Sequence, residues 1–478
     1  MTEIIVGPPG CGKTTALLDI VEEELDRGTE PDRIGFVSFT RRAAEEASGR
    51  AQHRFGLTRD DLPYFRTLHS LCFRMLGVTS GQMMTGEHLR TFSDLVGYPI
   101  NESFSVSTAP QTRGDRLLFM ENLARVRQIS LEQIYNEDDD DLSWWEVLRF
   151  AETLRGFKGK TGVRDFTDLL TEFVVKGTAP RMEVVLVDEA QDLSILQWEV
   201  VRKITEGARR VVIAGDDDQA IYRWSGADVA SFIRAEGEVR TLGQSWRVPR
   251  KVQDIAGQII SRVPDRRPKE WRARDEEGSV FWHAHQDLLD FSSGDILVLA
   301  RNHRQLRSVE EAIRSSGYLY ETKGDRSLDD TMLNAVRTWE RWRRRETLTY
   351  GDLDRIRPYY SGGLPRGPED DTAPHPPHEV GHWFDEMDKI PLKDAAYLRA
   401  ALRRGEKMDH PRIRLSTIHG MKGGQADKVY LLTDMSRRTH KEYLRSPEDE
   451  HRVFYVACTR AREELHIIAP NTRRNYSV

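Results

Sequence analysis

The feature that most constrains this chain is a glycine-rich stretch near its first residue, residues 7–15, with the sequence Gly-Pro-Pro-Gly-Cys-Gly-Lys-Thr-Thr. An apolar run typical of a β-strand, Ile4 to Val6, precedes it, and a helical pattern begins at Ala16. Glycine, four residues and then Gly-Lys-Ser/Thr is the pattern of a phosphate-binding loop between a strand and a helix. Glycines let the backbone turn its N–H groups toward phosphate oxygens, and the helix N-terminus favours negative charge. The stretch therefore predicts a nucleoside triphosphate site.

Each position of this loop can be given a role in binding. We expect the loop to surround the phosphates of ATP with Gly7, Pro8, Pro9, Gly10, Cys11, Gly12 and Thr15. Lys13 is expected to reach the β- and γ-phosphates, and the Thr14 hydroxyl is expected to bind Mg²⁺. The alternative is a chance glycine-rich turn, and the strand and helix on either side argue against it.

A pair of carboxylates follows the most strand-like run of the chain, residues 184–187. Asp188, at the tip of this predicted buried strand, is placed where a phosphate loop needs a Mg²⁺-holding aspartate. Glu189 would lie beside it and could act as general base toward the attacking water. The alternative is an ordinary helix N-terminus, where acidic residues are favoured. The four apolar residues before the pair and the phosphate loop in the same chain favour the catalytic interpretation.

A third predicted strand, residues 211–215, ends in a polar cluster. Within that cluster Gln219 is a candidate γ-phosphate sensor, because an amide can both donate and accept. Tyr222 and Trp224 alternate in the following turn and would suit stacking on unpaired bases. For either aromatic alone core packing is the better interpretation, and the position directly after a strand end favours the functional one.

Length and composition bound the class of protein. The 478 residues suggest about three domains, and 38% hydrophobic residues are enough for sizeable cores. No apolar run approaches the roughly 18 residues of a membrane span. The three cysteines are scattered without CxxC spacing, which predicts a reducing, cytoplasmic location and no zinc site. A net charge of −6 does not by itself indicate nucleic-acid binding.

The phosphate loop and the polar segments after the predicted strands follow one another in an order that a known protein family shares. The sequence resembles superfamily 1 helicases of the UvrD/Rep/PcrA type, whose motifs are matched at residues 7–14, 38–44, 67–70, 187–192, 215–228, 242–247, 415–423 and 452–461. These motifs span nearly the whole chain. The resemblance implies an α/β fold of two RecA-like parallel-sheet lobes with helical insertions. The expected parts are lobe 1 at 1–79 and 161–240, a helical insertion at 80–160, lobe 2 at 241–320 and 412–478, and a short accessory insertion at 321–411.

The resemblance also implies roles at matching positions. Arg247 and Arg460 are expected to contact the γ-phosphate, and Trp246 to stack near adenine. The second half of the chain has strand patterns at 294–300, 429–433 and 465–469 but no phosphate loop of its own, so its arginines need a nucleotide held by the first lobe. Single-stranded DNA is expected to contact Phe39, Thr40, Thr67, His69, Tyr222, Trp224, Thr417 and His419.

Three departures from the family pattern are visible. Only three residues precede the first predicted strand, where the family carries a glutamine-bearing segment that reads adenine, so the resemblance does not by itself establish a preference for ATP over other triphosphates. Gln425 stands where the family has a ribose-binding glutamate. The accessory insertion is short; its Pro- and Gly-rich residues 359–378 predict a flexible loop rather than a core, and its basic, aromatic residues 339–345 predict either a phosphate-backbone contact or a solvated helix face.

The main functional hypothesis is an ATP-dependent helicase that moves along single-stranded DNA and opens duplex junctions, with 3′-to-5′ polarity implied by the resemblance. An ATP-gated binding module that clears proteins from DNA without unwinding is the alternative, and an RNA-acting motor is a third. A nucleoside kinase would leave the arginines of the second lobe unexplained. Expected partners are single-stranded DNA and replication or repair proteins, with no membrane.

Overall fold

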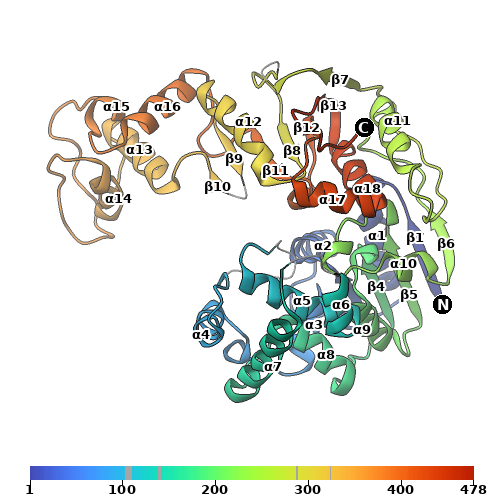
Figure 1. Ribbon diagram of the computed structural model, residues 1–478. Coiled ribbons are helices and arrows are strands. Elements are labelled where there is room, and N and C mark those ends of the chain that lie inside the picture. Colours follow the sequence, from blue (N-terminus) through green and yellow to red (C-terminus); the bar gives the residue numbers. More distant parts are fainter. Residues whose placement is uncertain (103–109, 138–140, 287–288, 323–324) are drawn as a thin grey trace. The chain divides into compact units, whose positions relative to one another are not determined.

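The computed structural model describes all residues except 103–109, 138–140, 287–288 and 323–324, and it divides the chain into two compact units (Figure 1). The first unit comprises Met1–Val248, Gly257–Asp275 and His451–Tyr455. The second comprises Pro249–Ala256, Glu276–Glu450 and Val456–Val478. Each unit is built around a sheet of its own.

The sheet of the first unit has six strands in the order β3-β2-β4-β5-β1-β6, and all paired strands run parallel. The strands are β1 (Thr2–Val6), β2 (Ile34–Ser38), β3 (Phe65–Thr67), β4 (Val184–Asp188), β5 (Arg210–Gly215) and β6 (Glu238–Thr241). The carboxyl ends of parallel strands meet at one edge of a sheet, which is where such folds bind ligands. The loops that carry the predicted nucleotide residues of the first unit follow from this edge, whereas Gln425 and Arg460 belong to the second unit.

Alternating strand residues supply two separate cores, because successive side chains of a strand point to opposite faces. On one face, residues such as Ile5 and Leu186 pack with helices α1 (Lys13–Asp26) and α2 (Arg41–Phe55). On the other face, their neighbours Ile4 and Val187 pack in a second core to which further helices contribute, among them α3 (Leu68–Met75), α8 (Phe166–Lys176) and α9 (Ile195–Thr205). Helices therefore cover both sides of the sheet, which explains why central strands such as β4 read as continuous apolar runs, whereas β6 at the sheet edge is exposed.

A group of helices with its own core lies between β3 and β4 in the sequence. It contains α4 (Gly86–Val96), α5 (Arg113–Arg127), α6 (Leu131–Glu137) and α7 (Trp144–Thr161). These helices extend from Gly86 to Thr161, and the sequence predicts a helical insertion at 80–160. The short helix α10 (Val229–Arg234) follows β5 and precedes β6.

The sheet of the second unit has seven strands in the order β10-β9-β11-β8-β12-β13-β7. All its pairs are parallel except β9 with β10. The strands are β7 (Ser279–His283), β8 (Ile296–Ala300), β9 (Tyr320–Thr322), β10 (Asp325–Arg326), β11 (Ile413–Thr417), β12 (Ala426–Leu432) and β13 (Ala461–Ile468). The helices α12 (His303–Ser315) and α17 (Arg437–Arg445) belong to this unit, whereas α11 (Arg250–Ile260) and α18 (Pro447–Cys458) have residues in both units. The predicted α/β class with two parallel-dominated sheets is confirmed.

Within the accessory insertion, the segment 359–378 differs from the expected flexible loop, because residues of that segment are packed in a core. The helices of the insertion are α13 (Asp330–Arg343), α14 (Tyr350–Ile356), α15 (Trp383–Glu386) and α16 (Leu392–Arg403). Trp339 and Trp342 of α13 are 0% and 4% exposed, and they belong to the same core as Leu364 and Ala373 of the Pro- and Gly-rich segment. The indole Nε1 of Trp339 donates to the Gly381 carbonyl at 3.0 Å, so the tryptophans anchor the loop.

The basic, aromatic segment of α13 therefore does not offer its tryptophans to a nucleic acid. Its arginines form local pairs instead, with Nε of Arg341 on Glu346 at 3.1 Å and Nε of Arg343 on Glu340 at 2.9 Å. The interpretation as a solvated helix face, with its aromatic side turned into the core, is the one that the structure favours. Over the described residues, no helix is both long and apolar enough to span a membrane.

Candidate active site

The phosphate loop joins β1 to α1 and closes on its own lysine. Gly10 and Gly12 adopt positive φ angles of 73° and 85°, which favour glycine. The Lys13 ammonium donates to the carbonyls of Gly7 at 2.8 Å and Pro8 at 3.4 Å. Burial would lower the pKa of Lys13, but Cys11 and the nearby carboxylates, Asp216 foremost, raise it above its ordinary value. The loop thus holds a buried cation next to its backbone N–H groups.

Asp188 ends β4 and meets the start of α1. The Thr14 hydroxyl donates to Oδ2 of Asp188 at 2.9 Å, so the two predicted magnesium ligands lie in direct contact. Burial, and then the charge of Glu189, raise the pKa of Asp188 to about 6. A hydroxyl and a carboxylate are hard oxygen ligands that suit Mg²⁺, and a divalent cation would relieve the cost of burying this charge. The residues present therefore fit a magnesium ion.

Glu189 lies directly after Asp188 in a conformation that is rare outside glycine. Its φ is 53°, in the left-handed region, where a non-glycine residue costs roughly 1 kcal/mol or more and is often found at functional sites. Gln191, which is fully buried, donates from Nε2 to Oε2 of Glu189 at 2.5 Å. Its Oε1 accepts from the Asp216 N–H at 2.9 Å, so it links the ends of β4 and β5.

Gln219, the predicted sensor, is also buried at this edge of the sheet. Its Nε2 donates to Oδ2 of Asp216 at 2.7 Å. Asp216, Asp217 and Asp218 are each 0% exposed, and their carboxylates lie within 4.8 Å of one another, as metal ligands would. The ammonium of Lys269 stands among all three, with its nearest oxygen at 2.6 Å, so an internal cation already balances this cluster.

Residues 242–248 pack directly on the phosphate loop. The Ser245 hydroxyl donates to the Pro9 carbonyl at 2.7 Å, and the Trp246 N–H donates to the Gly10 carbonyl at 2.9 Å. A Cβ added at Gly10 would stand 2.3 Å from Cβ of Arg247, which explains why the loop needs glycine there. The indole of Trp246 is 73% exposed, as a ring awaiting a stacking partner would be.

This packing places Arg247 differently from the sequence expectation. The sequence predicts that lobe 2 begins at residue 241, but the chain through Val248 belongs to the first unit. The hydrogen bonds of Ser245 and Trp246 to the carbonyls of Pro9 and Gly10 attach this segment to the loop. Arg247 therefore belongs to the unit that holds the loop, and Arg460 belongs to the other.

Arg460 is held within the second unit by three hydrogen bonds. Its Nε donates to the Val456 carbonyl at 2.9 Å, Nη1 donates to the Gly424 carbonyl at 3.2 Å, and Nη2 donates to the Thr459 hydroxyl at 3.3 Å. Gln425, the predicted ribose contact, follows Gly424 with an exposed side chain, and its carbonyl accepts from Nη2 of Arg414 at 2.9 Å. The two predicted residues thus come from adjoining segments.

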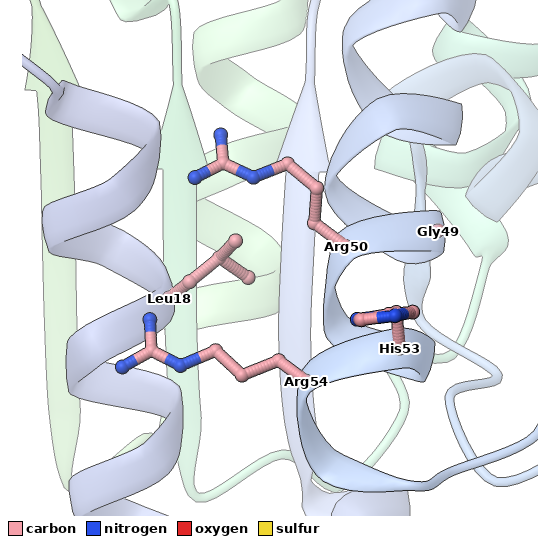
Figure 2. Close-up of a pocket in the computed structure, with 5 residues that line it drawn as sticks. All are labelled: Leu18, Gly49, Arg50, His53 and Arg54. Atoms are coloured by element: carbon pink, nitrogen blue, oxygen red, sulfur yellow. The ribbon is translucent and has the colours of Figure 1, made fainter.

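Sequence reasoning missed Arg50, which lines a cavity of about 340 Å³ with Leu18, Gly49, His53 and Arg54. Figure 2 shows Arg50 and Arg54 extending from α2 toward α1. Nη2 of Arg50 donates to the Thr15 hydroxyl at 2.8 Å, at the end of the phosphate loop. Arg50 also pairs with Glu46 at 3.9 Å, while Arg54 pairs with Asp19, 2.7 Å away, and with Glu22. Arg50 lies outside the motifs, so local pattern gave no signal for it.

The predicted DNA residues of the first unit follow β2, β3 and β5. Thr40 and Thr67 cap α2 and α3, each accepting from a backbone N–H at 3.2 Å. The rings of Phe39 and Tyr222 contact each other with centroids 5.5 Å apart. Helix N-termini attract phosphates and paired aromatics offer stacking surfaces, so this arrangement suits a single strand.

The other predicted DNA residues have additional packing roles. Trp224 stacks on Phe119 of α5 at 5.9 Å between centroids, which covers part of its ring. His69 lies edge-on to Phe166, and burial lowers its pKa to about 4, so it is a neutral hydrogen-bonding group near pH 7. In the second unit, the Thr417 hydroxyl accepts from the Gly420 N–H at 3.2 Å, and His419 begins the turn that follows β11.

Two models of known helicase domains match this chain. The UvrD/REP helicase N-terminal domain model matches residues 2–240, half of the chain, and the UvrD-like helicase C-terminal domain model matches residues 387–472. The chain belongs to the UvrD/Rep helicase family. The first match contains the phosphate loop and both strand-end carboxylate clusters, and the second contains Arg460.

Relatives of this UvrD/Rep family member include one enzyme, PcrA, from several bacteria. The chain is 24% identical over 378 residues to the ATP-dependent DNA helicase PcrA of Bacillus subtilis, covering 67% of this chain and 48% of that protein. It is 22% identical over 384 residues to PcrA of Staphylococcus aureus strain Mu50, covering 73% and 51%. The chain spans about half the length of these curated relatives. A crystal structure of Arterivirus nonstructural protein 10 (helicase) shares 13% identity at a TM-score of 0.38, covering 98% of this chain and 59% of that chain, a likeness too low to carry an argument.

Proposed function

We propose that this UvrD/Rep family chain is a motor that hydrolyses Mg²⁺-bound ATP and moves along single-stranded DNA, with 3′-to-5′ polarity. The observation that carries the proposal is the 2.9 Å hydrogen bond between Thr14 and Asp188, which joins the phosphate loop to the strand-end carboxylate. Lys13 of the same loop is a cation within reach of both. Phosphoryl transfer needs these parts together.

In the proposed reaction the chain's own groups orient water and neutralise charge. The Lys13 ammonium would leave the carbonyls of Gly7 and Pro8 for the β- and γ-phosphates. Thr14 and Asp188 would hold Mg²⁺, which when bound would neutralise negative charge on the phosphate oxygens. Glu189 would accept the proton of the attacking water.

Arginines and the amide complete the proposed site. Gln219 would contact the γ-phosphate and the water, while Arg247 and Arg460 would balance the charge that spreads over the transferring group. Trp246 would stack on the base, and Gln425 would contact the sugar. Each of these roles is supported by the match to the family motifs.

For DNA, we propose that the strand is held by phosphate contacts at helix starts and by stacking. The capped N-termini at Thr40 and Thr67 would bind phosphates, and the ring pair Phe39–Tyr222 would stack on bases. Trp224, His69, Thr417 and His419 would complete the path. Duplex junctions would be opened as the strand advances, in step with nucleotide hydrolysis.

The test is ATP hydrolysis and strand displacement by the purified chain. We expect Mg²⁺-dependent hydrolysis that single-stranded DNA stimulates more than RNA of equal length, and displacement of a duplex with a 3′ tail but not of one with a 5′ tail. Stimulated hydrolysis without displacement of either duplex would favour the alternative, a DNA-stimulated ATPase that clears protein–DNA complexes. Failure to hydrolyse ATP under any of these conditions would refute the proposal.

A further inference from the structure

Lys269 is a fully buried lysine outside all the family motifs. Its side chain is 0% exposed, and Nζ lies 2.9 Å from Oδ1 of Asp216, 2.6 Å from Oδ1 of Asp217 and 3.0 Å from Oδ2 of Asp218. An unpaired buried ion costs several kcal/mol, so a lysine is tolerated here because it faces three carboxylates. The fold brings Lys269 next to these three aspartates, which lie about fifty residues earlier in the chain.

Two of the three carboxylates have further partners of their own. Arg266 binds Asp218 with two hydrogen bonds, at 2.9 and 2.8 Å. The Arg267 N–H donates to Oδ2 of Asp217 at 2.8 Å. These contacts attach residues 266–269 to the segment after β5, and they involve atoms of the first unit alone.

Asp216 differs from its neighbours because it touches the proposed catalytic residues. Its Oδ2 accepts from Nε2 of Gln219 at 2.7 Å, while its Oδ1 faces Lys269. Its backbone N–H donates to Gln191, which in turn donates to Glu189. Both the amide and the general base of the proposed reaction are therefore connected to one aspartate.

The hydrogen-bonding chemistry of Asp216 determines which way the Gln219 side-chain amide is turned. A carboxylate can only accept, so Gln219 must turn its NH₂ toward Asp216, and its carbonyl oxygen is the end directed away from that carboxylate. Burial would raise the pKa of Asp216, but the charges of Lys269 and Lys13 outweigh it and keep the pKa below its ordinary value. Without Lys269, the carboxylate of Asp216 would face two like charges, and its Oδ1 would keep the weaker bond from the Asp218 N–H at 3.3 Å but lose the ammonium at 2.9 Å.

We propose that Lys269 is a positioning residue for ATP hydrolysis, acting through Asp216 to fix the orientation of the Gln219 amide. The inference rests on the proposed function, because it takes Gln219 as the group that contacts the γ-phosphate and the attacking water. It adds a residue after α11 to a site otherwise built from motif residues.

The kinetic test compares Lys269→Met, which keeps the length and loses the charge, with Lys269→Arg, which keeps the charge. With saturating oligo(dT), Lys269→Met is expected to lower kcat by about 10- to 100-fold, because a misplaced group costs rate rather than binding. KM for ATP should stay within about 3-fold of the wild-type value. Lys269→Arg should recover part of the lost kcat.

Two further variants separate positioning from folding. Arg266→Gln breaks the same network at Asp218 without touching Asp216, so it should lower the unfolding midpoint and leave kcat unchanged. If Lys269→Met is insoluble, the double variant Lys269→Met/Asp218→Asn removes one negative charge together with the positive one. The double variant should fold and still show the low kcat.

A second readout does not depend on hydrolysis. With ¹⁵N-glutamine labelling, the side-chain amide signals of Gln219 are identified by their loss in Gln219→Glu. They should move toward free-amide positions in Lys269→Met and stay in place in Arg266→Gln. Unchanged amide signals, or kcat losses that follow stability equally in the Lys269 and Arg266 variants, would overturn the inference. A wild-type chain without ATPase activity would refute the proposed function, while the amide signals would still decide the positioning.

Discussion

At the phosphate loop, the side chain of Lys13 donates to two carbonyls of the loop itself, at Gly7 and Pro8. These carbonyls are weaker partners for a cation than a triphosphate, because a carbonyl carries no net charge, whereas the phosphate oxygens add a direct attraction between opposite charges. The loop carbonyls therefore hold the Lys13 ammonium next to the proposed phosphate site. Only a small movement of the side chain would transfer it from the carbonyls to the phosphates.

Replacement of Lys13 by alanine is expected to lower the ATPase kcat by at least about 100-fold, because it removes the cation that balances the γ-phosphate. The chain should remain folded, since the lost hydrogen bonds are to carbonyls that water can reach once the side chain is gone. Steady-state hydrolysis with oligo(dT) measures the effect, and circular dichroism checks the fold. Lys160→Ala, at an exposed position on α7, is the control and should retain wild-type rates.

His69 predicts a pH effect on stability. Its pKa is about 4 in the folded chain because of burial, against 6.5 for the free side chain, so the unfolded chain binds more protons between these values. Stability should therefore fall as pH drops from 6.5 toward 4, by at most about 3 kcal/mol from this group. His69→Gln should flatten that part of the curve in urea unfolding at several pH values. His53→Gln, at an exposed histidine of α2, should leave the curve as it is.

Residue-scale prediction from sequence worked where spacing along the chain defines the geometry. Lys13 and Thr14 belong to one turn of backbone, and Asp188 follows an unmistakable buried strand, so their meeting could be anticipated. Gln191 and Lys269 could not be found in this way. Their roles arise from contacts between the ends of different strands, and no local pattern encodes such contacts.

At the scale of elements, central strands such as β4 and β5 could be predicted because burial on both faces makes them continuous apolar runs, whereas the exposed strand β6 has no such pattern and was not predicted. The segment 359–378 shows the opposite case. Proline and glycine indicate an irregular backbone, but they do not say whether that backbone is packed. Here the packing is supplied from a distance, by indole rings of α13 that reach the carbonyls of Gly381 and Pro374.

The core role of α13 can be tested with one tryptophan. Trp339→Ala should destabilise the chain by about 3–5 kcal/mol, because it removes a fully buried ring and leaves a cavity. It should also make residues 359–382 sensitive to limited proteolysis, since the ring no longer holds that segment. Trp145→Ala is the matched control: this ring is 75% exposed, and its loss should change neither property. Equal effects of both substitutions would contradict the assignment of α13 to the core.

For the whole molecule, the two arginines proposed for the γ-phosphate come from different units. Arg247 is attached to the phosphate loop through its neighbours Ser245 and Trp246, whereas Arg460 is bonded to groups of the second unit. Under the proposed function, ATP binding alone needs the first unit, and fast hydrolysis needs both. This division makes the contribution of the second unit separable by substitution.

Arg460→Lys is expected to lower kcat by about 1000-fold, the effect of losing an arginine that stabilises the transferring phosphoryl group, because lysine cannot offer the same fork of donors. Binding of a fluorescent, non-hydrolysable ATP analogue should change by less than about 5-fold, since the phosphate loop supplies most of the ground-state contacts. Arg462→Lys, at a half-exposed arginine paired with Asp427, is the matched control and should behave as wild type in both assays. Thermal unfolding checks that the lost bonds to Val456 and Gly424 have not unfolded the second unit. If Arg460→Lys hydrolyses ATP at near wild-type rates while Lys13→Ala does not, the second unit takes no part in the chemical step, and its arginine serves to hold the segment at Gly424 in place.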